Sequence, residues 1–146
     1  MITWASSKQY AILSDHDYVY LETEQGQRVV GWMYGNPTGG LIDLHETWAV
    51  VIGTGLWVIR LPLTDNIDVD TVPVLSSTQV FAGAGQAHVG APLVQLMATP
   101  EDSMHVETVY DPQGATDVVR IVADLQGRYA GIYDVDLQTL EVIKRL

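Results

Sequence analysis

Apolar and polar residues alternate with a period of two along much of the chain, which is the pattern of half-buried β-strands. In residues 17–23, tyrosines alternate with a valine and a leucine, so that each kind falls on one face. A return strand over residues 28–34 places Trp32 and Tyr34 on one side. Gly26, between the two runs, can take the positive φ that a tight turn requires. The pattern predicts a first β-hairpin.

Two further runs, residues 48–52 and 56–61, are apolar almost without interruption and are separated by residues 53–55. Strands that are buried on both faces have this composition, so the runs predict a second hairpin at the centre of the fold. Residues 35–40 lie before it and are rich in glycine, with one asparagine and one proline. This segment is predicted to be a loop.

The middle of the chain has a less regular pattern. Residues 71–82 are predicted to be extended, because valine and phenylalanine supply most of their bulk. Residues 92–97 fit either a strand or one or two helical turns. Residues 100–103 resemble a helix start, with a proline and two acids, and the alternation up to Tyr110 favours a short turn followed by a strand. Residues 89–105 are therefore left open between strand and helix.

The last third of the chain predicts a three-stranded meander over residues 117–125, 128–135 and 140–146. We expect residues 1–146 to form a single, mainly β domain of about nine or ten short, mostly antiparallel strands, with at most one or two short helical turns. The domain would be a sandwich or a partly closed barrel. One or two propeller blades are an alternative for the meander, although the chain is too short for a full propeller.

Composition narrows the possible environments of this domain. The 146 residues are 47% hydrophobic, which suffices for a core without covalent staples. The absence of cysteine excludes disulfides, thiolate zinc sites and thiol catalysis. No basic segment followed by an apolar run occurs at the start, so we expect no signal peptide and a cytoplasmic location. The uncharged stretch 71–100 contains prolines, glycines and polar residues and is not expected to span a membrane.

The chain is strongly acidic, with 18 acidic and 7 basic residues and a net charge of −11. Residues 1–100 carry 9 acidic and 3 basic residues (−6), and residues 101–146 carry 9 and 4 (−5), so the charge is spread through the domain. Such a field repels nucleic acid, which we therefore do not expect as a partner. It attracts basic proteins and speeds their encounter, although the same charge also maintains solubility.

Familiar motifs for phosphates and metals are not matched. Residues 83–90 fail as a dinucleotide loop, since His88 stands where the third glycine is needed. Asp65, Asp68 and Asp70 gather three carboxylates without the spacing of a calcium-binding loop, and they predict a solvated acidic turn. The four histidines form no pair at metal-binding spacing. We expect neither a cofactor nor a metal.

Asp43 and His45 are the best acid–base candidates. Two residues apart, they would share a face if their segment were extended, and a carboxylate can orient an imidazole. The pair lacks a recognisable nucleophile, so a small hydrolase-like enzyme is the least favoured function. The histidine within residues 15–17 lies between two aspartates, and this segment is predicted to be a surface turn before the first strand.

All four tryptophans and four of the seven tyrosines lie within the first 57 residues. Aromatic side chains build cores, but they also anchor interfaces. We therefore expect a non-enzymatic interaction domain for a basic protein, such as an inhibitor or immunity-type protein. Its expected contact residues are Asp15, Asp17, Glu22, Glu24, Asp65, Asp68 and Asp70, with Trp32 and Tyr34 as anchors. The alternative is a barrel or sandwich that binds a small apolar or sugar-like ligand against the tryptophans.

Overall fold

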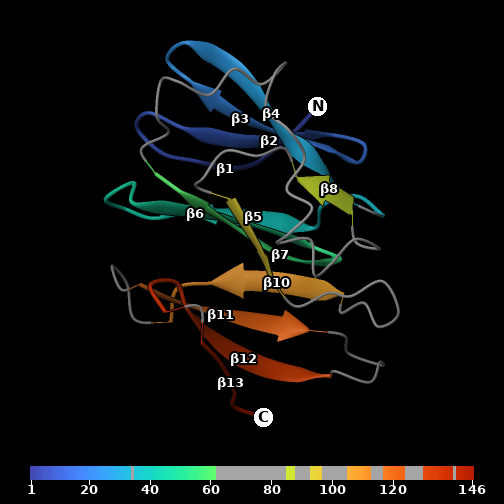
Figure 1. Cartoon of the computed structure of the whole chain (residues 1–146), viewed down its shortest axis with the longest axis vertical. Helices are drawn as coiled ribbons and strands as arrows, with labels where there is room; N and C mark the ends of the chain where they lie inside the picture. The colour runs from blue at the N-terminus through green and yellow to red at the C-terminus, as the bar shows by residue number, and fades with distance from the viewer. Residues whose placement is uncertain are drawn as a thin grey trace.

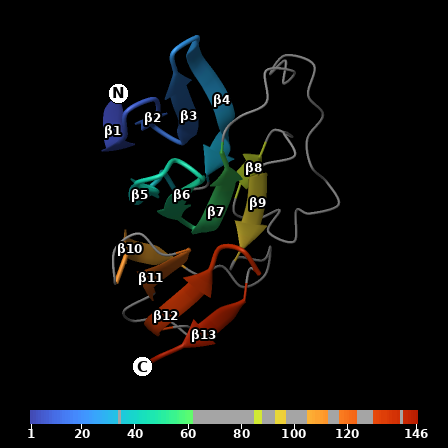
Figure 2. The same ribbon diagram turned by 90° about the vertical axis from the view of Figure 1, so that its left-hand side faces the viewer.

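Three antiparallel β-sheets lie one above another in the computed structural model (Figure 1 and Figure 2). The regular elements among the described residues are all strands, so the mainly β prediction is confirmed. The sheets stack as layers and do not close into a barrel. The structure describes residues 1–33, 35–61, 85–87, 93–96, 105–112, 117–123, 130–139 and 141–146, with only the backbone at 85–87 and 93–96.

The N-terminal sheet has the strand order β1-β2-β3-β4-β8. Its strands are β1 (Ile2–Ser6), β2 (Ala11–Asp15), β3 (Tyr18–Thr23), β4 (Gly26–Met33) and β8 (Gly85–Ala87). The predicted first hairpin is β3–β4, with Thr23 paired to Gly26 and with Gly26 at a φ of 116°.

The central sheet has the order β5-β6-β7-β9, and the C-terminal sheet has the order β10-β11-β12-β13. The central strands are β5 (Gly39–Ile42), β6 (Trp48–Gly53), β7 (Gly55–Arg60) and β9 (Leu93–Leu96). The C-terminal strands are β10 (Val106–Tyr110), β11 (Val118–Ala123), β12 (Gly131–Asp136) and β13 (Val142–Lys144). The second hairpin, β6–β7, and the C-terminal meander are both confirmed.

The central sheet is buried on both faces, which explains the uninterrupted apolar runs of β6 and β7. Along β6, Val50 packs toward the C-terminal sheet and Val51 toward the N-terminal sheet. Along β7, Val58 packs toward the C-terminal sheet and Trp57 toward the N-terminal sheet. Because successive side chains of a strand point to opposite faces, one strand can supply two cores. Two hydrophobic cores therefore hold three layers together.

The first strands of the three sheets lie at one common side of the stack, with β1 against β5 and β5 against β10 (Figure 2). The remaining strands of each sheet spread away from that side. Meandering sheets that fan out from a shared edge are arranged like neighbouring blades of a β-propeller. The propeller-blade alternative considered for the C-terminal meander stays a prediction.

Several expectations require correction. Residues 35–40 were predicted as loop throughout, but Gly39 and Gly40 begin β5. A Cβ at Gly40 would lie 3.1 Å from Cδ1 of Ile12 and 3.2 Å from the Val50 carbonyl oxygen, so glycine permits this close approach of two sheets. The turn at residues 15–17 follows two strands that were not predicted and joins β2 to β3. The domain consequently has more strands than expected.

The structure decides part of the segment 89–105, which the sequence left open between strand and helix. Residues 93–96 form a strand, β9, and a strand runs to Tyr110 as expected. The extended segment predicted for 71–82 and the short turn predicted for 100–103 lie outside the described residues.

Candidate functional site

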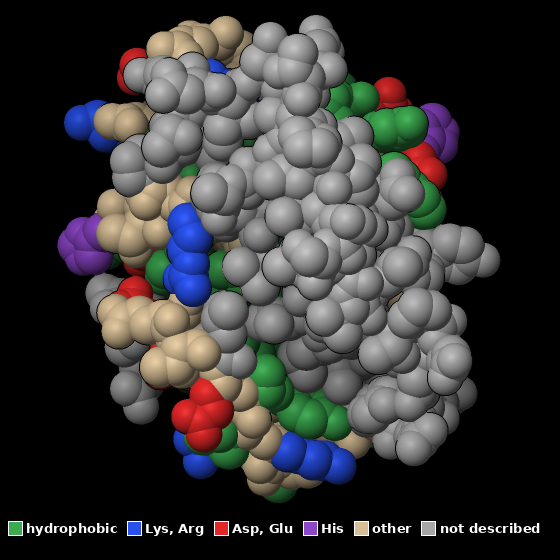
Figure 3. All heavy atoms as spheres, viewed as in Figure 1, with side chains coloured by type: hydrophobic (Ala, Val, Ile, Leu, Met, Phe, Trp, Pro, Cys, Tyr) green, Lys and Arg blue, Asp and Glu red, His purple; other side chains and the backbone are tan. Residues whose placement is uncertain are grey.

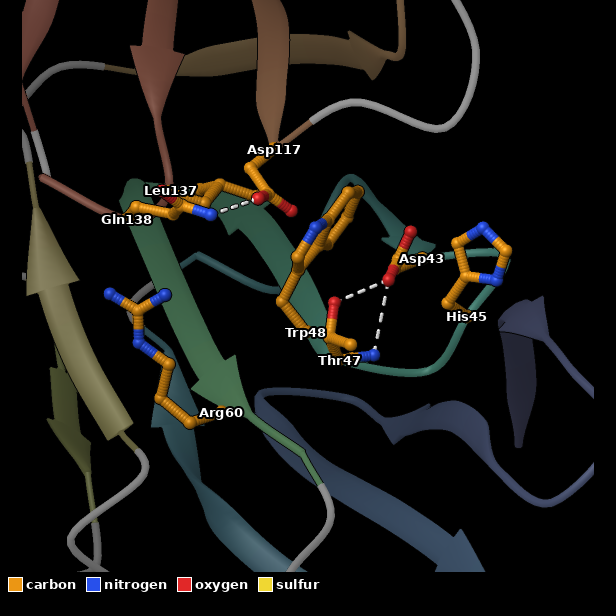
Figure 4. A pocket seen from close by; sticks show the side chains of 8 residues that line it. All are labelled: Asp43, His45, Thr47, Trp48, Arg60, Asp117, Leu137 and Gln138. Carbon is orange, nitrogen blue, oxygen red and sulfur yellow. Dashed lines mark hydrogen bonds between the residues drawn. The ribbon is translucent and has the colours of Figure 1, made fainter.

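A pocket of about 470 Å³ opens at the ends of the central and C-terminal sheets (Figure 4). The β5–β6 loop, the end of β7, the residue before β11 and the turn after β12 contribute to its wall. The lining residues are Asp43, His45, Thr47, Trp48, Arg60, Asp117, Leu137 and Gln138. The pocket therefore contains the predicted acid–base pair, together with residues far away in the sequence.

The Asp43 side chain closes the loop between β5 and β6. Its carboxylate accepts hydrogen bonds from the Thr47 backbone N–H (3.1 Å) and from the Thr47 hydroxyl. The Glu46 N–H donates to the Asp43 carbonyl oxygen (2.9 Å), so residues 43–47 form a tight turn. Burial raises the pKa of Asp43, but the hydrogen bonds from Thr47 and the charge of His45 outweigh it and hold that pKa below its ordinary value. Asp43 is thus an ionised structural group.

Asp43 and His45 were expected to share a face if their segment were extended. The segment is not extended, since the loop turns and Glu46 has a φ of 55°. Within the described residues no hydrogen bond joins the His45 ring to Asp43, whose carboxylate is bonded to Thr47 (Figure 4). Aspartate side chains commonly bond to the backbone just ahead of them, and here that turn chemistry overrides the extended conformation. His45 is exposed at the pocket rim.

Trp48 forms the buried part of the pocket wall. It is 2% exposed, and its indole Nε1 has no hydrogen-bond partner among the residues that the structure describes. In the close-up, Trp48 lies between the Asp43–Thr47 bonds and the hydrogen bond from Gln138 Nε2 to the Asp117 carboxylate (Figure 4). An unpaired buried donor beside a cavity is a feature that periodicity could not have indicated.

The outer face of the N-terminal sheet is the second candidate site. Tyr18 lies opposite Trp32 in the β3–β4 register, and Leu13 lies opposite Tyr20 in the β2–β3 register. Tyr18 is 47% exposed, while Tyr20 and Trp32 are half-buried. The face opposite to Val19 and the rest of the inner core is therefore aromatic. We call Leu13, Tyr18, Tyr20 and Trp32 the aromatic face.

Four of the predicted acidic contact residues lie on the same sheet as the aromatic face. Asp15, Glu22 and Glu24 are exposed and Asp17 is half-buried. Figure 3 shows apolar side chains directly beside acidic ones at the upper right margin, over this sheet. The other predicted contact residues, Tyr34, Asp65, Asp68 and Asp70, lie outside the described residues.

The other tryptophans belong to the interior. Trp48 and Trp57 are buried in the two cores, and Trp4 donates from Nε1 to Ser14 Oγ at 2.8 Å. Trp32 is therefore the one tryptophan of the four that is available as an outward anchor, and the concentration of tryptophans near the N-terminus mainly reflects core packing.

No protein-family model, no curated protein and no solved structure matches the chain. Among the described residues, no three His, Asp or Glu side chains are grouped to hold a metal ion. Nor does this part of the chain include a helix with the length and apolar character needed to cross a membrane. Function must therefore be argued from the pocket and the aromatic face.

Proposed function

We propose that this chain is a non-enzymatic interaction domain that binds a basic partner protein through the aromatic face. One observation carries the proposal: Tyr18, Tyr20 and Trp32 lie together on the outward side of one sheet, with four carboxylates on the same three strands and their turns. Tyrosine and tryptophan are the residues that most often anchor protein interfaces. The surrounding carboxylates would attract a cationic surface and orient it.

The geometry favours binding over catalysis. Asp43, the acid of the predicted acid–base pair, is bonded to Thr47 and closes a turn. An inhibitor or immunity-type protein, which covers the cationic active site of a partner, is the specific form of this function that the acidic charge suggests.

The test compares capture of partners from the native host by the immobilised wild-type chain and by Trp32→Ser and Tyr18→Ser variants. We expect a captured protein with a basic surface, elution at about 0.5 M salt, and at least tenfold weaker binding by each variant. Tyr110→Ser is the matched control, because Tyr110 is 41% exposed on the C-terminal sheet. Binding that ignores salt, or that survives both substitutions on the aromatic face, contradicts the proposal.

A further inference from the structure

The indole N–H of Trp48 is the starting point for a separate site. A buried donor without a partner costs about 1–3 kcal/mol, so native proteins rarely leave one unpaired. Another tryptophan of this chain, Trp4, does donate a hydrogen bond from its indole N–H, to Ser14. In the described part of the chain the Trp48 Nε1 has no partner, and Trp48 lines the pocket of about 470 Å³. The Trp48 indole N–H is thus an unsatisfied hydrogen-bond donor beside a cavity large enough for a small ligand.

Arg60 supplies a second unfilled donor to the same pocket. It is the last residue of β7 and is half-buried, and within the described residues its guanidinium makes no ion pair or hydrogen bond. Its guanidinium points toward the Gln138 end of the pocket (Figure 4). Its charge is felt by Asp136, whose pKa is lowered mainly by the N–H groups of Thr139 and Gln138 and also by Arg60. A guanidinium and an indole N–H together suit a carboxylate.

Carboxylates lie at the other side of the pocket. Asp117 accepts a hydrogen bond from Gln138 Nε2 at one oxygen, Oδ2, and Asp43 is bonded to Thr47. Asp43 and Asp117 line the pocket, and Asp136 feels the charge of Arg60. Among the described residues the acids here therefore outnumber the arginine, and an anion alone would be repelled. A ligand that carries both a positive and a negative group matches this distribution.

We propose that the pocket binds a small zwitterion of the α-amino-acid type. The ligand carboxylate pairs with Arg60 and accepts from Trp48 Nε1, and its ammonium group donates to Asp117. The ligand can reach the buried Nε1 only if a neighbouring side chain moves. The exposed Gln138 side chain therefore swings aside on binding and releases Asp117. The volume of about 470 Å³ lies within the range of small-molecule sites. This site is distinct from the aromatic face and does not depend on the proposed protein partner.

The test follows the four indole N–H signals of the full chain by ¹H–¹⁵N NMR, with Trp48→Phe identifying the Trp48 signal. The probes are the free α-amino acids, their N-acetyl derivatives, the corresponding amines without a carboxylate, and monosaccharides. We expect a saturable shift of the Trp48 signal with at least one amino acid. Loss of either charge from the ligand should weaken binding by about tenfold or more.

Two substitutions in the wall test the assigned contacts, since Trp48→Phe perturbs the core. Arg60→Gln and Asp117→Asn should each weaken binding by about tenfold, whereas Arg28→Gln, on the N-terminal sheet, should leave it unchanged. The site is refuted if no amino acid shifts the Trp48 signal at about 10 mM, roughly the weakest useful range for such ligands. The ligand class is refuted if N-acetyl derivatives or monosaccharides bind as well. Trp32→Ser should not affect this binding, which separates the result from the proposed protein interaction.

Discussion

At the scale of single residues, Asp134 is the most strongly held charge in the described structure. It is 6% exposed although it belongs to the outer face of the C-terminal sheet. Arg120 donates to it from Nε at 2.7 Å and from Nη2 at 3.2 Å, and Arg145 donates from Nε at 2.8 Å. The hydrogen bonds from Arg120, and then those from Arg145, lower the pKa of Asp134 to about 2. Asp134 thereby ties the end of the chain to β11 and β12.

Asp134→Asn should lower the free energy of unfolding by about 1–3 kcal/mol at pH 7, because two arginines lose their shared carboxylate. The native pKa lies below the unfolded value, so this stabilisation is complete above about pH 4 and is lost as pH falls through about 2. Urea unfolding of both proteins between pH 7 and pH 2 measures it, with Glu141→Gln on an exposed residue as control. A difference between wild type and variant that stays constant with pH would show that the charge of Asp134 is not responsible.

At the scale of strands, glycines set how closely neighbouring elements approach. Gly53 ends β6, and a Cβ there would collide with Met33 Sδ and lie 3.0 Å from the Asn36 carbonyl oxygen. A Cβ at Gly39 would meet only the end of the Ile52 side chain, at 3.2 Å. The backbone of Asn36 cannot yield as a side chain can, so the two positions differ in tolerance.

Gly53→Ala should therefore destabilise the protein by about 1–3 kcal/mol, while the matched Gly39→Ala should cost less than about 1 kcal/mol. Thermal unfolding of the two variants beside wild type compares them directly. Equal losses would mean that the close approach of Gly53 to Met33 and Asn36 relaxes without cost.

At the scale of the whole molecule, the central sheet holds the stack together. Each of its two long strands contributes to both cores, so a change on either face disturbs a different pair of layers. Strands at the margin contribute less to the cores: Val142 and Ile143 of β13 remain 37% and 45% exposed. The layers thus depend on two faces of one sheet.

Val50→Ala and Val51→Ala should each lower the free energy of unfolding by about 1–3 kcal/mol, although the two side chains point in opposite directions. Val142→Ala should change it by less than about 0.5 kcal/mol. Equilibrium denaturation measures all three. If Val50 and Val51 differed so much that one behaved like Val142, the three-layer arrangement would be contradicted on that face.

The hydrophobic pattern determined much of the local structure. It predicted β3–β4, β6–β7 and the C-terminal meander, because alternation and continuous apolar runs follow directly from the geometry of a strand. It missed β5, since Gly39 and Gly40 carry no side-chain pattern and belong to a strand through their pairing with Ile52 and Val51 of β6.

Both candidate sites depended on tertiary contacts to different degrees. Tyr18 and Trp32 are close in sequence, and hairpin register alone places them opposite each other, so the sequence could anticipate the aromatic face. The pocket joins Arg60 to Asp117 and Gln138. No local pattern indicates that these residues line one pocket. The pocket arises only where the central sheet packs on the C-terminal sheet, which leaves the Trp48 indole N–H beside it. The sequence by itself determined strands and hairpins, whose forces act between near neighbours, and the stacking of sheets decided the cores and the pocket.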